Sequence, residues 1–194
     1  MVVNRKTLRI ARFGLGTLYL FMLTPVARTW FEATMTAHML LQIPLLAAIG
    51  FAASRLLPER CQLGLLAAVG GAVPCVVLAI FASSYWMLPR ALDAALANPL
   101  AETGKFLSIP ILIGIPLALA WRRLSILGRG FVWTNFFSML AVLGWLYIAA
   151  PVRICNSYLV NEQVLTGWHM VKLALFLFVW WLARFFIGSQ PVPR

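Results

Sequence analysis

The sequence predicts an all-α fold: a polytopic membrane protein built as a bundle of about six transmembrane helices, in one domain over residues 1–194. Of the residues, 62% are hydrophobic and only 11% are charged, and the mean hydropathy is +0.90. Soluble domains are close to half apolar and a quarter charged, so the composition excludes a soluble globular protein. Helices are expected because an open strand leaves backbone groups unpaired in lipid.

Six segments are long and apolar enough to cross a hydrocarbon core, which requires roughly 20 residues of helix. They cover residues 8–27, 34–57, 63–87, 105–121, 131–151 and 165–187. The first follows a basic stretch and has no A-x-A cleavage site after it, so we expect a retained helix rather than a signal peptide.

Small residues and prolines mark the third and fourth segments. "LGLLAAVGGAV" places Gly64, Ala67, Ala68 and Gly71 in the third, which predicts a face for close helix packing. The fourth contains Pro110, Gly114 and Pro116. Both residue types are common in membrane helices, and a broken helix at a transport site is the second interpretation.

The connection between the third and fourth helices predicts a short amphipathic helix. In "MLPRALDAALANPLAETGK" the residues Leu88, Leu92, Leu96 and Leu100 recur at i, i+4, and Pro89 suits the first position of a helix. Such a segment is expected to lie on the membrane surface.

Basic residues predict the orientation. With both termini in the cytoplasm, eleven of the sixteen Lys and Arg residues lie inside, and four of the five acidic residues lie outside. This positive-inside bias predicts a multi-pass protein of the bacterial inner membrane. Topology and anionic lipid headgroups explain the net charge of +11, so we expect the lipid bilayer as a partner and no nucleic acid.

The stretch "TMTAHMLLQ" holds the first candidate site. Met35, His38, Met39 and Gln42 share one helix face, and two thioethers with one imidazole suit Cu(I). His169 and Met170 are expected at a similar outer level of the sixth helix. The alternative is that methionine fills apolar gaps and histidine is hydrogen-bonded within the bundle.

Other chemistry is not indicated. The sequence has no GxSxG, P-loop or HExxH motif, so we predict that the protein is not an enzyme. Cys61, Cys75 and Cys155 have no CxxC or Cys/His spacing, and no disulfide or zinc module is predicted. Lys172 is expected to extend toward the interface or to pair with Glu32, Glu102 or Glu162.

Four stretches together resemble the CtaG-type (caa3-oxidase-associated) cytochrome c oxidase assembly proteins. "AHMLLQIPLL" is similar to the family's H-M-x-x-H element, "YWMLPRALDAAL" to W-H-x-P, "AETGKFLSIP" to an E-H pair, and "NEQVLTGWHM" to D-Q-x-x-x-G-x-x-M. The matching positions are His38, Trp86, Pro89, Glu102, Glu162, Gln163, Gly167 and Met170. The chain departs from the pattern where Gln42, Met87 and Thr103 replace histidines.

The resemblance implies a copper-handling assembly factor for a haem-copper oxidase or a similar copper membrane enzyme. The candidate Cu(I) ligands are then Met35, His38, Met39, Met87, His169 and Met170. The alternative is a non-catalytic accessory subunit of a larger membrane respiratory or copper enzyme complex, with the metal site lost. Both imply other membrane protein subunits as partners.

Overall fold

The computed structural model describes residues 5–187, which form helices and no strand. Four helical stretches are long and apolar enough to cross a membrane: Met35–Arg55, Pro99–Trp121, Ile126–Ala149 and Val160–Arg184. Two bent helix pairs bring the number to as many as six. The predicted all-α, polytopic membrane fold is confirmed.

The first predicted span, 8–27, does not continue through Pro25. Helix α1 (Arg5–Leu23) ends there, and α2 (Pro25–Glu32) leaves at 70°. Thr24 accepts a hydrogen bond from the Ala27 amide, and Pro25 occupies the first helical turn, so these residues start a new helix.

The second and fourth spans each contain a π-helical segment two residues before a proline. The second comprises α3 (Met35–Ala37), η1 (His38–Gln42) and α4 (Ile43–Arg55), with Pro44 in the first turn of α4. The fourth comprises α8 (Pro99–Ser108), η2 (Ile109–Gly114) and α9 (Ile115–Trp121), with Pro116 in the corresponding place. Proline has no backbone N–H group to donate to the preceding turn. That turn therefore widens into a π-helical turn without breaking a backbone hydrogen bond.

Helices α4 and η2 cross in close contact at two glycines. A Cβ at Gly50 would lie 2.3 Å from the carbonyl oxygen of Pro110, and one at Gly114 would lie 2.2 Å from that of Ala47. The small-residue face predicted in the third segment is not used in this way, since a Cβ at Gly64 would meet no atom within 4 Å.

The third predicted span, 63–87, is broken. Helix α5 (Glu59–Val69) and α6 (Ala72–Trp86) meet at an angle of 74°. Gly70 and Gly71, with φ values of 93° and 110°, form the corner, in a region of backbone space that glycine adopts readily.

The last two helices form an antiparallel pair. Helix α10 (Ile126–Ala149) and α11 (Val160–Ile187) approach closely at Gly144 and Gly167, where a Cβ on either residue would lie within 3 Å of the other's carbonyl oxygen. Helix α11 also contacts α3, where the hydroxyls of Thr36 and Thr166 are 2.8 Å apart. The second and sixth predicted helices therefore touch.

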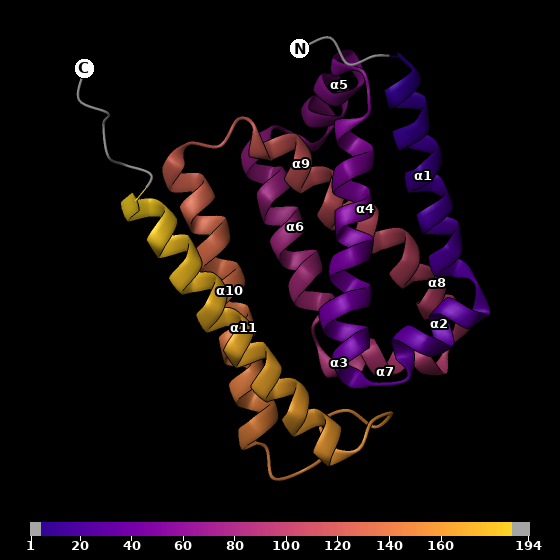
Figure 1. Ribbon diagram of the computed structural model, residues 1–194, viewed down its shortest axis with the longest axis vertical. Coiled ribbons are helices and arrows are strands. Elements are labelled where there is room, and N and C mark those ends of the chain that lie inside the picture. The colour runs from indigo at the N-terminus through magenta and orange to yellow at the C-terminus, as the bar shows by residue number, and fades with distance from the viewer. Residues whose placement is uncertain (1–4, 188–194) are drawn as a thin grey trace.

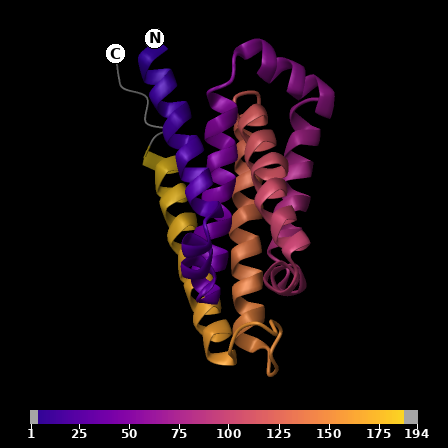
Figure 2. The ribbon, with the colours of Figure 1, turned by 90° about the vertical axis from the view of Figure 1, so that its right-hand side faces the viewer.

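The bundle has two distinct ends (Figures 1 and 2). At one, which we call the α5 end, lie α5, the start of α1, the turn from α9 to α10 and the end of α11. At the other, the α7 end, lie α2, α3, α7 (Pro89–Ala97) and the α10–α11 loop of residues 150–159.

Helix α7 is the short helix predicted between the third and fourth spans, but its apolar face meets protein. Ala91, Leu92 and Ala95 are buried. Leu100 belongs to α8, which starts after the Asn98 N-cap, so the four leucines do not form one lipid-facing stripe. Helix α7 therefore covers the end of the bundle.

Candidate functional site

A buried polar network lies near the α7 end of the bundle. Its side chains come from four segments: Glu32 at the end of α2, His38 and Gln42 on η1, Lys105 on α8 and Tyr158 in the α10–α11 loop. His38, Gln42 and Lys105 are fully buried. As predicted, His38 and Gln42 share a buried helix face with Met35 and Met39.

Lys105 is the centre of this network. Its ammonium group lies 2.6 Å from Glu32 Oε1, 3.1 Å from His38 Nε2 and 3.1 Å from Gln42 Oε1. An ammonium group has three N–H donors, so every donor has an acceptor. Gln42 Nε2 also donates to Glu32 Oε1 over 3.2 Å, which closes the network.

The hydrogen bonds assign the tautomer of His38. The Tyr158 hydroxyl donates to the backbone carbonyl of Glu32 at 3.0 Å, so its oxygen accepts from His38 Nδ1, also at 3.0 Å. Nδ1 therefore carries the proton, and the Nε2 lone pair faces the Lys105 ammonium. Burial, together with the Glu32 carboxylate, raises the pKa of Tyr158 above its usual value, so this hydroxyl stays a donor.

The network does not leave His38 arranged as a copper ligand. Both imidazole nitrogens are engaged, and a metal ion at Nε2 would meet the positive charge of Lys105. Within residues 5–187, no three His, Cys, Asp or Glu side chains come together as a metal-binding group. His38 therefore has no free nitrogen for Cu(I) in this arrangement, and copper binding stays a prediction.

The thioethers and the second histidine are placed differently. Four predicted methionine ligands, Met35, Met39, Met87 and Met170, are buried in one apolar core. His169 is exposed on α11, away from the buried face that its neighbour Met170 occupies. The structure thus gathers the methionines in the same core and leaves His169 outside it.

The positions of the family-like motifs have structural roles. Gln163 accepts from the amide of Ile154 and donates to the carbonyl of Tyr147, so it fastens the α10–α11 loop. Trp86 is buried, and its indole N–H donates to Ser108 at 2.8 Å. Pro89 starts α7, and Glu102 forms an ion pair with Arg28.

Sequence reasoning missed Lys105. The fourth span was predicted to begin at residue 105, whereas α8 starts six residues earlier, at Pro99, and carries Lys105 into the core. Lys172, the lysine considered for pairing, is exposed. Glu32 pairs with Lys105 instead, and both ion pairs of the described residues join α2 to α8. The one feature of the sequence that could have indicated the burial of Lys105 is the apolar helical segment that directly follows it.

A second cluster holds the α10–α11 loop against α7. The Asp93 carboxylate accepts hydrogen bonds from the amides of Asn156 at 2.8 Å and Ser157 at 3.0 Å, and the Cys155 thiol lies 3.4 Å away. Burial acts to raise the pKa of Asp93, but the donors from Asn156, Ser157 and Cys155 outweigh it and lower the pKa below the usual value. Burial and the Asp93 charge raise the pKa of Cys155 to about 12, so the thiol stays protonated.

Replacement of Asp93 by asparagine is expected to loosen this loop. The folded pKa of Asp93 is depressed, so its stabilising contribution is present above the unfolded pKa of about 3.9 and is lost as the pH falls toward the folded value. At neutral pH, hydrogen exchange at the Asn156 and Ser157 amides should become about tenfold faster in Asp93→Asn. Glu162→Gln, at a half-exposed acid on α11, is the control and should leave exchange unchanged; equal rates in the two variants would refute this role.

Comparison of the chain with protein-family models, curated proteins and solved structures gives no match.

Proposed function

We propose that the protein is a non-catalytic membrane protein that supports the assembly or stability of a larger membrane enzyme complex. The kind of complex is the one that the sequence resemblance implies, a haem-copper oxidase or another copper enzyme. The observation that carries the proposal is the hydrogen bonding of His38, which occupies the metal-motif position and is used to join α2, η1, α8 and the α10–α11 loop.

Both ring nitrogens of His38 are hydrogen-bonded, which favours a structural role for this residue over a role in a reaction. The Lys105 ammonium is hydrogen-bonded to both the Glu32 carboxylate and the His38 imidazole, so Nε2 of His38 is not free to bind a metal. Ionisable residues within a membrane helix are costly, and they usually face the bundle interior and pair with one another. Here Lys105 is fully buried, and the network fixes the shape of the α7 end.

Copper handling is the second candidate, and the buried methionines favour it. Met35, Met39 and Met170 lie on α3, η1 and α11, and α3 contacts α11. Thioethers are soft ligands suited to Cu(I). A site that also uses His38 requires Lys105 to move away from Nε2, which costs the ion pair to Glu32.

The proposal places the protein in the bacterial inner membrane with the α5 end in the cytoplasm. Supporting this orientation, the α5 end carries the basic residues Arg9, Arg12, Arg55, Arg60, Arg122, Arg123, Arg129 and Arg184. Four of the five acidic residues lie in α2, α7, α8 and the start of α11, which meet at the α7 end. Cytoplasmic ends of membrane helices are enriched in Lys and Arg.

Co-purification from native membranes tests the function. The tagged chain, extracted in mild detergent, is expected to bring down subunits of a respiratory or copper enzyme in a fixed ratio. Met39→Leu should keep that ratio, because leucine fills a similar volume without a thioether. Lys105→Met should lower it, because the α7 end loses its network. Absence of any such subunit, or loss of the partner in Met39→Leu alone, would contradict the proposal.

A further inference from the structure

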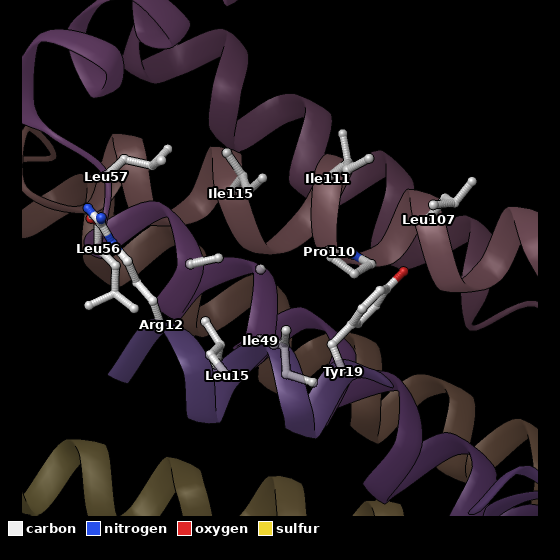
Figure 3. Close-up of a pocket in the computed structure, with 13 residues that line it drawn as sticks. Arg12, Leu15, Tyr19, Ile49, Leu56, Leu57, Leu107, Pro110, Ile111 and Ile115 are labelled. Atoms are coloured by element: carbon white, nitrogen blue, oxygen red, sulfur yellow. The ribbon is translucent and has the colours of Figure 1, made fainter. Parts of the chain in front are cut away.

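A narrow apolar groove runs along the outside of the bundle between α1, α4 and the η2 span. Its volume is about 410 Å³, and its walls are aliphatic side chains such as Leu15, Ile49, Ile111 and Ile115 (Figure 3). This volume lies within the range of about 300–1,000 Å³ that is typical of ligand sites. The groove opens at the surface of the bundle, where Leu57, Leu107 and Ile111 are exposed.

A polar contact lies at each end of the groove. At one end, the Arg12 guanidinium reaches across to the carbonyl of Leu56 at 2.8 Å. At the other, the Tyr19 hydroxyl donates to the carbonyl of Phe106 at 3.1 Å. Seven residues of α1 separate Arg12 from Tyr19, which is about 10 Å along the helix axis. A partner helix would have to run past both contacts, whereas a segment of a hydrocarbon chain fits between them.

The basic residues at the Arg12 end of the groove favour a ligand with an anionic group. Arg12 is exposed, and within residues 5–187 it forms no ion pair with a carboxylate, so guanidinium donors remain for another acceptor. Arg9, Arg55 and Arg60 belong to the same end of the bundle, and Glu59 is the one acidic residue of the sequence placed there. Guanidinium groups bind phosphate oxygens in a bidentate manner.

We infer that this groove binds an anionic phospholipid, with its phosphate on Arg12 and the first part of one acyl chain along Leu15, Ile49 and Ile111 as far as Tyr19. Both parts of the ligand are matched by the residues that meet them: a cation at the membrane surface and an aliphatic slot below it. The lipid fills a surface that α1 and the η2 span leave open, and so joins α1 to the rest of the bundle.

Native mass spectrometry of the delipidated full chain tests the site. Titration with dioleoyl phosphatidylglycerol and, separately, dioleoyl phosphatidylcholine should show tighter binding of the anionic lipid. Arg12→Gln should weaken phosphatidylglycerol binding about tenfold and remove the preference, because the phosphate loses a charge-assisted contact. Arg9→Gln, a nearby exposed arginine that does not line the groove, should keep it.

Two glycines of α1 provide a test variant and a matched control for the apolar part of the groove. Gly14 and Gly16 are both exposed, and a Cβ on either would meet no atom within 4 Å, but only Gly16 lines the groove. Gly16→Leu should fill the slot and weaken binding of both lipids, while Gly14→Leu should not. Equal affinity for the two lipids in the wild-type chain, equal effects of Arg12→Gln and Arg9→Gln, or unchanged binding in Gly16→Leu would each overturn the inference.

Discussion

Replacement of Lys105 by methionine is expected to lower the free energy of unfolding by about 3–5 kcal/mol, the usual cost of removing one partner of a buried ion pair. Methionine is close to lysine in length, so the loss would not come from a cavity. It would come from the Glu32 carboxylate, which would keep its charge without the ammonium group 2.6 Å away. His38 Nε2 and Gln42 Oε1 would each lose a donor as well. Reversible unfolding in mixed micelles measures the effect.

Two further variants test whether the loss of stability comes from the Glu32–Lys105 ion pair rather than from the replacement of a lysine as such. Glu32→Gln added to Lys105→Met removes the unpaired charge and should recover part of the lost stability. Lys172→Met changes an exposed lysine of α11 in the same way and should alter stability by less than about 0.5 kcal/mol. Equal, small effects of Lys105→Met and Lys172→Met would mean that the network does not hold the α7 end.

Gly114→Ala is expected to cost about 1–3 kcal/mol, although a single methyl group is added. The new Cβ would lie 2.2 Å from the carbonyl oxygen of Ala47 and 2.6 Å from the amide nitrogen of Phe51, both backbone atoms of α4. Backbone cannot rotate away as a side chain does, so α4 and η2 must separate and lose contact along their crossing.

Gly104→Ala is the control for Gly114→Ala. It lies in the same span, and its Cβ would meet no atom within 4 Å. Alanine favours helix over glycine by up to about 1 kcal/mol, so this variant should be neutral or more stable. A stability change of the same sign in both variants would contradict the close crossing of α4 and η2.

The sequence predicted well the features that a lipid bilayer requires of a helix, namely its length and its apolar composition. Hydropathy located the membrane segments, because a helix in lipid must be long and apolar whatever its neighbours. It failed where local backbone chemistry intervened: Thr24 and Pro25 end α1, and Gly70 and Gly71 turn the chain between α5 and α6. Apolar residues continue through both corners, so hydropathy alone could not separate the helices.

The candidate site was predicted in part. The sequence predicted the residues that share one helix face, but not the residues of other helices that contact them. Helical spacing placed Met35, His38, Met39 and Gln42 on one face, and that face is buried. The partners of His38 are Tyr158 and Lys105, which lie 120 and 67 residues away along the chain. No spacing rule links such distant residues, and a single sequence does not show which face of α8 meets η1.

Copper content of the purified protein tests most directly whether His38 has a structural role. The chain is isolated from copper-supplied cells, its partners are removed, and copper per chain is measured beside His38→Gln and Met39→Leu. With His38 held by Lys105 and Tyr158, the wild-type chain should carry no more copper than His38→Gln. One copper per chain in the wild type, lost in both variants, would contradict the account and establish a Cu(I) site at His38.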